Sequence, residues 1–308
     1  MPGCILTPEL VDSHTHLVFG GDRSDEYVLR LNGEDYQIIA AAGGGILKTV
    51  TETTKLSADE LFALGRARIE HIATYGVGTI EIKSGYGLSF EKELEISYVI
   101  DRLKKHFSPT VQIFNTNLAA HAIPKNYSGT IYLDQVVLPL LTRLKKENII
   151  DAADIFHEVG YFNEADTLKF LETCKQLSLP IKIHADEFND NGGARFAAIY
   201  SALSADHLLK TSPDGITALK NSSTVATFLP GTGLFLGKGM APAQNFLSAG
   251  VKVSIASDYN PGSCHCDNLL MLAAIATPSY KMNIAQLWAA ITLYAAHALC
   301  LKNQGALY

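Results

Sequence analysis

The 308-residue sequence has few charged residues and no long run of basic ones, and each shortage excludes a class of protein. Charged residues make up 18% of the chain and hydrophobic residues 47%, a balance that supports a sizeable core and excludes a disordered or fibrous chain. The 25 Lys and Arg are outnumbered by 31 Asp and Glu, which gives a net charge of −6. Without a basic cluster to neutralise a phosphate backbone, nucleic acid is not an expected partner.

The sequence also has little cysteine and no apolar run long enough for a membrane span. The most apolar stretch, 287–301, is interrupted by Thr292 and His297 and is shorter than the roughly 20 residues that a spanning helix needs. We therefore expect a buried helix there and no membrane partner. The five cysteines are spread from Cys4 to Cys300 with no secretory hydrophobic segment before them, which favours reduced thiols and a cytoplasmic location over a disulfide framework.

Short segments rich in β-branched residues alternate along the chain with segments of helical periodicity. Strands are predicted at 9–13, 77–82, 111–117, 153–157, 181–184, 204–206, 224–229 and 251–257. The run Ser57-Ala58-Asp59-Glu60 predicts a capping box at the start of one helix, and Asn163 predicts the N-cap of another. Further helices are predicted at 91–106, 133–146, 193–203, 213–220, 243–249, 268–276 and 284–299. Eight alternations predict a parallel sheet that closes into a (β/α)8 TIM barrel, a single domain over residues 1–308, with a doubly wound open sheet as the alternative.

Metal-compatible side chains follow several of the predicted strands. His14 and His16 are two residues apart, so a strand sends both imidazoles to the same face. His184, His207 and Asp258 end later strands, and the carboxyl ends of barrel strands surround one pocket. A single histidine at a strand end is more often a hydrogen-bonded core residue, but five such residues on four strands favour a metal site. Imidazoles with a carboxylate suit zinc or iron and leave room for water, whose pKa a bound cation lowers, so a hydrolase is expected.

Other motifs have plainer readings. The run Cys264-His265-Cys266 lacks the companion cluster that a zinc knuckle needs. The run Gly43-Gly44-Gly45 lacks the Gly-Lys-Ser/Thr of a phosphate loop and is expected to form a turn. Lys182 shares the strand face of His184, and we expect it to make an ion pair inside the barrel.

The run 11–16, Val-Asp-Ser-His-Thr-His, together with Asp258 on a late strand, resembles the amidohydrolase superfamily of metal-dependent (β/α)8 barrels. Five runs that span nearly the whole chain in order narrow the resemblance to the imidazolonepropionase family of histidine degradation. They are HTHLVFGGDR at 14–23, AAGGGI at 41–46, EIKSGYGL at 81–88, HADEF at 184–188 and SDYNPGS at 257–263. The resemblance implies hydrolysis of the ring C–N bond of the cyclic amide 4-imidazolone-5-propanoate, with N-formimidoyl-L-glutamate as product.

Matched position by position, the resemblance also implies roles for individual residues. One zinc or iron ion would be held by His14, His16, His184 and Asp258. Substrate contacts would come from Arg23, Tyr86, His121, Glu187 and Ser263, and product contacts from Asn260 and Gly262. The catalytic residues would be Glu187, His207 and Asp258, and Tyr36 is expected to border the pocket.

The chemistry of these side chains agrees with the implied roles. The planar cation of Arg23 suits a propionate carboxylate, although a surface ion pair is its alternative role. Asp258 and His207 would assist deprotonation of the water that attacks the ring carbonyl. Glu187 lies three residues after His184 and would position the ring or move a proton to the departing nitrogen, whereas its alternative is a solvated loop acid.

The sequence departs from the superfamily pattern in two places. Members with two metal ions use a modified lysine at the end of the fourth strand, where this chain has Phe156-His157-Glu158, so one ion is expected, with His157 or Glu158 as an accidental second site. Members of this type also carry a small β-sandwich, but the first strand starts within ten residues of Met1 and the chain stops at Tyr308. We therefore expect a barrel that lacks most of the sandwich and so exposes apolar surface. Such a surface favours association with a partner, for example a second copy in a homodimer.

Two other functions stay open at this stage. A deaminase of the same superfamily with one metal ion would keep the ligands but would not need Arg23, Tyr86 and His121 as a carboxylate pocket. Activity on cytosine or guanine would favour it. A metal-binding barrel without turnover is the second alternative, and a folded, metal-loaded and inert chain would favour that one.

Overall fold

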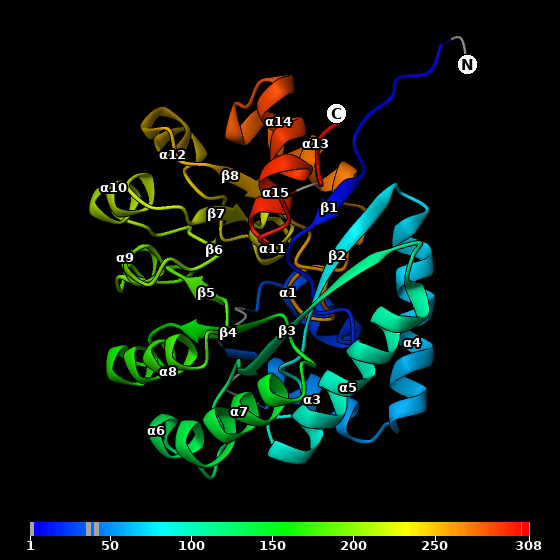
Figure 1. The fold of residues 1–308 in the computed structure, drawn as a ribbon, viewed down its shortest axis with the longest axis vertical. Helices are drawn as coiled ribbons and strands as arrows, with labels where there is room; N and C mark the ends of the chain where they lie inside the picture. The colour runs from blue at the N-terminus through cyan, green and yellow to red at the C-terminus, as the bar shows by residue number, and fades with distance from the viewer. Residues whose placement is uncertain (1–2, 35–37, 40–42, 303, 308) are drawn as a thin grey trace.

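Eight parallel strands form the centre of the computed structural model, which describes residues 3–34, 38–39, 43–302 and 304–307. The strands pair in chain order from β1 to β8 (Figure 1). Their bounds are Leu10–Asp12 (β1), Val77–Lys83 (β2), Gln112–Ala120 (β3), Ala152–His157 (β4), Ile181–Ala185 (β5), Ser204–His207 (β6), Val225–Phe228 (β7) and Val253–Ile255 (β8). All eight lie at the predicted places, and the (β/α)8 barrel is confirmed.

Main-chain hydrogen bonds join the first and last strands just beyond their carboxyl ends. The His16 N–H donates to the Tyr259 carbonyl at 2.9 Å, and the Asp258 N–H donates to the His14 carbonyl at 2.9 Å. These bonds close the carboxyl end of the barrel next to the predicted metal ligands.

The helices lie around the sheet, most of them in an outer ring (Figure 1). Their bounds are Ser24–Leu31 (α1), Ile46–Thr54 (α3), Ala58–Ala73 (α4), Phe90–Phe107 (α5), Gly129–Tyr132 (α6), Leu138–Lys146 (α7), Glu164–Gln176 (α8), Gly193–Ile199 (α9), Pro213–Lys220 (α10), Pro230–Leu236 (α11), Ala243–Ala249 (α12), Leu269–Tyr280 (α13), Ile284–Ile291 (α14) and Leu293–His297 (α15). A π-helical turn, Leu133–Val137, joins α6 to α7. None of the described helices has both the length and the apolar character needed to cross a bilayer.

The predicted helix starts are confirmed at both caps. The Ser57 side chain accepts the Glu60 N–H while the Glu60 carboxylate accepts the Ser57 N–H, so α4 begins with a complete capping box. The Asn163 side chain accepts the Asp166 N–H at the start of α8. The prediction of one continuous helix over 284–299 is wrong, because the backbone leaves the helical region at Thr292 (φ −133°, ψ −87°) and separates α14 from α15.

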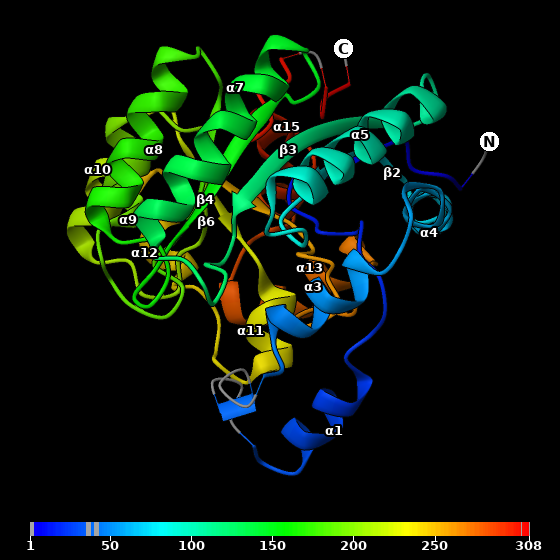
Figure 2. The same cartoon turned by 90° about the horizontal axis from the view of Figure 1, so that it is seen from below.

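Three helices that the sequence patterns did not predict lie together at the carboxyl side of the barrel. Figure 2 shows α1, α3 and α11 on one side of the molecule, apart from the ring that contains α5, α7 and α8. Arg30 of α1 donates to the Phe235 carbonyl of α11 at 3.2 Å, and the rings of Tyr27 and Phe235 lie 6.3 Å apart. Ile46 of α3 and Leu236 of α11 line the same cavity as the predicted site residues. These helices therefore form one wall of the site.

Candidate active site

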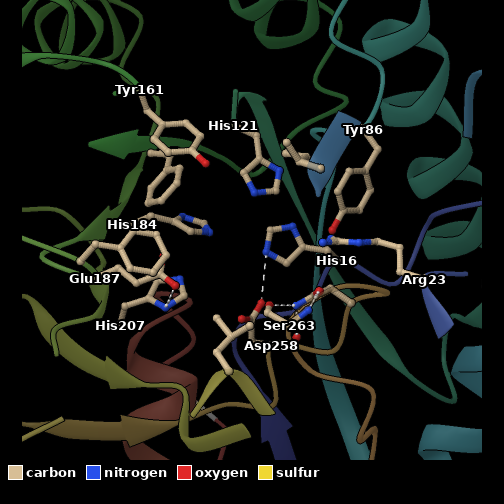
Figure 3. Close-up of a pocket in the computed structure, with 15 residues that line it drawn as sticks. His16, Arg23, Tyr86, His121, Tyr161, His184, Glu187, His207, Asp258 and Ser263 are labelled. Carbon is tan, nitrogen blue, oxygen red and sulfur yellow. Dashed lines mark hydrogen bonds and ion pairs between the residues drawn. The ribbon is translucent and has the colours of Figure 1, made fainter. Parts of the chain in front are cut away.

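A cavity at the carboxyl ends of the strands contains almost every residue that the sequence analysis selected (Figure 3). The selected residues that line it are His16, Arg23, Tyr86, His121, His184, Glu187, His207, Asp258, Asn260 and Ser263. His14 lies behind this lining and is fully buried, and Gly262 packs against Arg23. Tyr36 and residues 41–42 of the AAGGGI run lie outside the described residues. The barrel thus gathers at one place residues that are up to 249 positions apart, as His14 and Ser263 are.

Three of the predicted metal ligands converge on one point. The Nε2 atoms of His14 and His16 lie 3.1 Å apart. Asp258 Oδ1 lies 3.5 Å from His14 Nε2 and 3.4 Å from His16 Nε2. The i, i+2 spacing places both imidazoles on the same side of the chain as it leaves β1, and the bonds that close the barrel bring Asp258 to them.

His184 extends this cluster from the other side of the barrel. Within the described residues, three overlapping groups have ligand atoms within 4.8 Å of one another: His14 with His184 and His207, His16 with His121 and His184, and His14 with His16 and Asp258. His184 Nε2 is buried and has no hydrogen-bond partner among the described residues. An unsatisfied buried nitrogen beside other ligand atoms fits a bound cation, because buried polar atoms otherwise find partners. The site therefore fits a bound metal ion.

Burial favours the neutral, metal-binding form of four imidazoles at the site, those of His14, His16, His121 and His207. It lowers the pKa of His14, His16 and His121 well below the usual histidine value, and the charges of neighbouring histidines act in the same direction. Burial, followed by the charge of His184, lowers the pKa of His207 to about 3. Neutral imidazole is the form that donates a lone pair to a metal ion.

Two buried carboxylates hold metal-facing histidines from behind, and the sequence analysis missed both. Asp206 Oδ2 lies 2.6 Å from His14 Nδ1, and Asp154 Oδ2 lies 3.0 Å from His184 Nδ1. The contact at His14 is a hydrogen bond, whereas the contact at His184 is an ion-pair distance without hydrogen-bond geometry. A carboxylate behind Nδ1 leaves Nε2 to face the ligand site. The available signal was an acidic residue within each of two otherwise buried strands, β4 and β6.

Of the three predicted catalytic residues, Asp258 belongs to the ligand cluster, and Glu187 and His207 lie beside each other next to it. Glu187 Oε1 lies 3.7 Å from His207 Nδ1, and Asp258 accepts a hydrogen bond from Thr232. Burial, followed by the charges of Asp258 and Glu158, raises the pKa of Glu187 well above its usual value. Both His207 (φ 80°) and Asp258 (φ 53°) have left-handed backbone conformations, which are uncommon outside glycine and cluster at active sites.

Arg23 lies at the opposite end of the cavity, where part of its guanidinium already donates hydrogen bonds. Its Nε and Nη2 donate to Glu26 Oε2 at 2.9 and 2.8 Å. The same Glu26 carboxylate accepts the Gly45 N–H at 3.2 Å, which fastens the glycine-rich segment beside Arg23. The alternative role of Arg23, a surface ion pair, does not apply, because its ion pair with Glu26 is buried.

Buried acids also hold the two loops that carry Tyr86 and Glu187. Glu93 accepts backbone N–H groups from Gly85, Gly87 and Leu88 at 3.0, 2.6 and 3.1 Å, around Tyr86. Glu158 accepts those of Phe188 and Asn189 at 2.8 and 3.2 Å, directly after Glu187. Charge-assisted bonds of this kind fix a loop without a helix or strand.

The side chains considered for an accidental second metal site make other contacts. Glu158 holds the loop after β5, and His157 contacts Thr167 Oγ1 at 2.8 Å and the Asn191 carbonyl at 3.2 Å. Neither belongs to a metal-compatible group among the described residues. Lys182 makes the interior ion pair expected of it, with Glu81 at 3.1 Å.

The sequence is similar to curated relatives over almost its whole length. It is 43% identical over 305 residues to the imidazolonepropionase of Verminephrobacter eiseniae, covering 98% of this chain and 66% of that protein. It is 42% identical over 299 residues to the imidazolonepropionase of Bacillus cytotoxicus, and 41% identical to that of Bacillus mycoides, covering in each case 96% of this chain and 70% of the relative. The chain thus spans about two thirds of the length of these relatives. No family model matches it.

Solved structures share the fold at much lower sequence identity. A 5-methylcytosine deaminase from Klebsiella pneumoniae superposes with a TM-score of 0.74 at 14% identity, over 98% of this chain and 77% of that one. A zinc-bound adenosine deaminase from Xanthomonas campestris superposes with a TM-score of 0.65 at 18% identity, over 97% of this chain and 69% of that one. These likenesses agree with the barrel, and the curated relatives confirm the narrower resemblance. The chain belongs to the imidazolonepropionase family.

Proposed function

We propose that this chain hydrolyses the ring C–N bond of 4-imidazolone-5-propanoate, giving N-formimidoyl-L-glutamate, with one zinc or iron ion in the site. The observation that carries the proposal is the shared cavity of the histidine cluster and Arg23, in a chain 41–43% identical to imidazolonepropionases. The proposal places the reaction in the cytoplasm, which the cysteine content of the sequence favours.

The ion would be held by His14, His16, His184 and Asp258. When bound, it would supply Lewis-acid polarisation of the ring carbonyl and would lower the pKa of water. The proximity of the three closest ligand atoms, 3.1 to 3.5 Å apart, supports this assignment.

The remaining residues would bind the substrate and move protons. Arg23 would bind the propionate carboxylate, since a guanidinium matches the geometry of that group. Tyr86, His121 and Ser263 would orient the ring, and Asn260 and Gly262 would contact the product. Asp258 and neutral His207 would accept a proton from water as its oxygen bonds to the ring carbonyl carbon.

Breaking the ring C–N bond leaves a nitrogen that must take a proton. Glu187 would position the ring or deliver that proton. Its raised pKa supports the second role, because a buried carboxyl that keeps its proton can donate it. Water thus adds across the bond, the oxygen to carbon and the hydrogen to nitrogen.

The test is hydrolysis of 4-imidazolone-5-propanoate, followed as loss of ring absorbance, with metal content measured on the same sample. We expect turnover that a chelator abolishes and that zinc or iron(II) restores. Ammonia release from cytosine or guanine, without hydrolysis of the imidazolone, would instead support a deaminase. A folded chain with one bound metal and no turnover on any of these compounds would contradict the proposal.

A further inference from the structure

A layer of charged side chains fills the barrel interior beneath the histidine cluster. Its members are Glu81 and Lys83 of β2, Asp154 of β4, Lys182 of β5 and Asp206 of β6, and all five are fully buried. Barrel interiors are normally filled by branched apolar side chains. Burying a charged side chain costs free energy unless an opposite charge or hydrogen-bonding group lies beside it. The partners of each charge in this layer therefore matter.

Lys83 lies at the centre of the layer. Its Nζ is 2.7 Å from Asp154 Oδ2, 2.9 Å from Glu81 Oε2 and 3.9 Å from Asp206 Oδ2. Burial alone would lower the pKa of Lys83, but the carboxylates of Asp154, Glu81 and Asp206 outweigh it and raise the pKa above the usual lysine value. Lys83 is therefore a permanent cation between three acids.

Two of these acids are the ones that hold metal-facing histidines. The oxygen of Asp154 that contacts Lys83 also lies 3.0 Å from His184 Nδ1, and the oxygen of Asp206 nearest to Lys83 lies 2.6 Å from His14 Nδ1. One ammonium group thus neighbours both carboxylates, and each carboxylate contacts one histidine. His14 and His184 come from opposite sides of the ligand cluster.

We propose that Lys83 is a positioning residue for the metal site, holding Asp154 beside His184 Nδ1 so that the His184 imidazole directs Nε2 into the cavity. The ammonium fixes the position of the Asp154 carboxylate beside His184 Nδ1, and a carboxylate at that nitrogen favours the tautomer with the proton on Nδ1 and the lone pair on Nε2. The inference rests on the metal-binding part of the proposed function and is independent of the substrate.

Lys182 provides a matched control within the same layer. It is equally buried and also contacts Glu81, at 3.1 Å, but its shortest contact is with the Ser13 carbonyl at 2.7 Å. Its Nζ lies 3.7 Å from Asp206, and among the described residues it makes no ion pair with Asp154. A purely structural role would make Lys83→Met and Lys182→Met equivalent.

The experiment compares these two variants by zinc affinity and by the state of the histidine rings. Zinc dissociation constants are measured by competition with a chromophoric chelator, and folding is checked by circular dichroism and Tm. We expect Lys83→Met to bind zinc about 10- to 100-fold more weakly, the range for losing an outer partner of a metal ligand. Lys182→Met keeps the contacts from Lys83 through Asp154 to His184 and is expected to weaken zinc binding less than Lys83→Met does.

The ring state is read from nitrogen-15 NMR of histidine-labelled, metal-free protein. His184 is expected to carry its proton on Nδ1 in the unsubstituted chain and in Lys182→Met, and to lose this preference in Lys83→Met. This readout needs neither zinc nor turnover, so a chain that fails to hydrolyse the imidazolone still tests the inference.

The inference would be overturned if folded Lys83→Met kept both the zinc affinity and the His184 tautomer of the unsubstituted chain. It would also be overturned if the two lysine variants lost zinc affinity equally. If Lys83→Met does not fold, the double variant Lys83→Met/Asp154→Asn removes the uncompensated carboxylate together with the ammonium. We expect that variant to fold and still to bind zinc at least about tenfold more weakly. Unsubstituted affinity in the double variant would overturn the inference equally.

Discussion

Gly262 lies so close to Arg23 that a Cβ at position 262 would be 1.8 Å from Arg23 Nη1. The guanidinium of Arg23 therefore packs directly against the main chain of the loop after β8. Glu26 holds the other side of the same guanidinium through Nε and Nη2. The absence of a side chain at 262 and the carboxylate of Glu26 together determine where the Arg23 fork lies.

Gly262→Ala should displace Arg23 and weaken binding of the substrate carboxylate. Losing a charge-assisted contact raises KM by about 10- to 100-fold, with a smaller effect on kcat. The control is a double-mutant cycle with Arg23→Ala. If the alanine acts through Arg23, adding it to Arg23→Ala changes KM little further. A full additional loss in the double variant would contradict this explanation.

His207→Asn should keep the metal and lose most of the turnover. Burial lowers the pKa of His207 to about 3, and its Nδ1 lies 3.7 Å from Glu187, so the proton-transfer role proposed for it depends on the imidazole. We expect kcat to fall by about 100- to 10,000-fold, the usual contribution of a general base. Metal content is measured on the same preparation. An unimpaired rate would remove His207 from the chemistry, and loss of the metal would make it a ligand.

The stability of the metal-free chain should depend on pH through Asp12. Burial raises the pKa of Asp12 to about 7, although hydrogen bonds from Ser257 and His14 lower it. The unfolded carboxyl titrates near pH ~4, so the folded state binds this proton more tightly. The stabilising contribution is complete below the unfolded pKa and is lost as the pH rises towards about 7.

Asp12→Asn removes this titration. The free energy of unfolding of the unsubstituted chain should fall between about pH 5 and about pH 8. The variant lacks this titration, so its fall should be smaller by up to roughly 3 kcal/mol. Urea unfolding at both pH values, with a chelator present throughout, gives the comparison. Equal falls for the two proteins would show that Asp12 titrates normally in the folded state.

Ser57→Ala should destabilise the chain without affecting the site. The substitution removes the side-chain acceptor for the Glu60 N–H at the start of α4, which costs about 1 kcal/mol. Glu60→Gln keeps an acceptor for the Ser57 N–H and should cost less. Denaturant unfolding measures both, and kcat/KM should be unchanged in each. A change in kcat/KM would mean that α4 influences the cavity.

The strands and the histidine ligands could be predicted because their signals are local. The strand at 251–257 is marked by its own alternation of side chains. The shared direction of His14 and His16 follows from the two-residue period of a strand. The helices α1 and α3 have no comparable signal. In α1, Val28, Leu29 and Leu31 are exposed, so their spacing does not mark a buried face. The break at Thr292 has no proline or glycine to announce it.

The charged layer under the site was not predictable for a different reason. Glu81 and Lys83 are visible within the second strand, but the partner of Lys83 is Asp154, 71 residues away. Which charges meet inside a barrel depends on the register between neighbouring strands, and the order of residues along one strand does not specify that register. The sequence analysis expected an interior ion pair for Lys182 alone.

The hydrogen bonds between the His14–His16 segment and the Asp258–Tyr259 segment have a consequence for the order of folding. They join segments from nearly opposite ends of the chain, and contacts of such large sequence separation form late. A growing chain on the ribosome would carry the two histidines long before the carboxylate that completes the cluster. A bound metal ion would stabilise the closed barrel over partly folded forms that lack one of its ligands, so binding would favour the last step of folding.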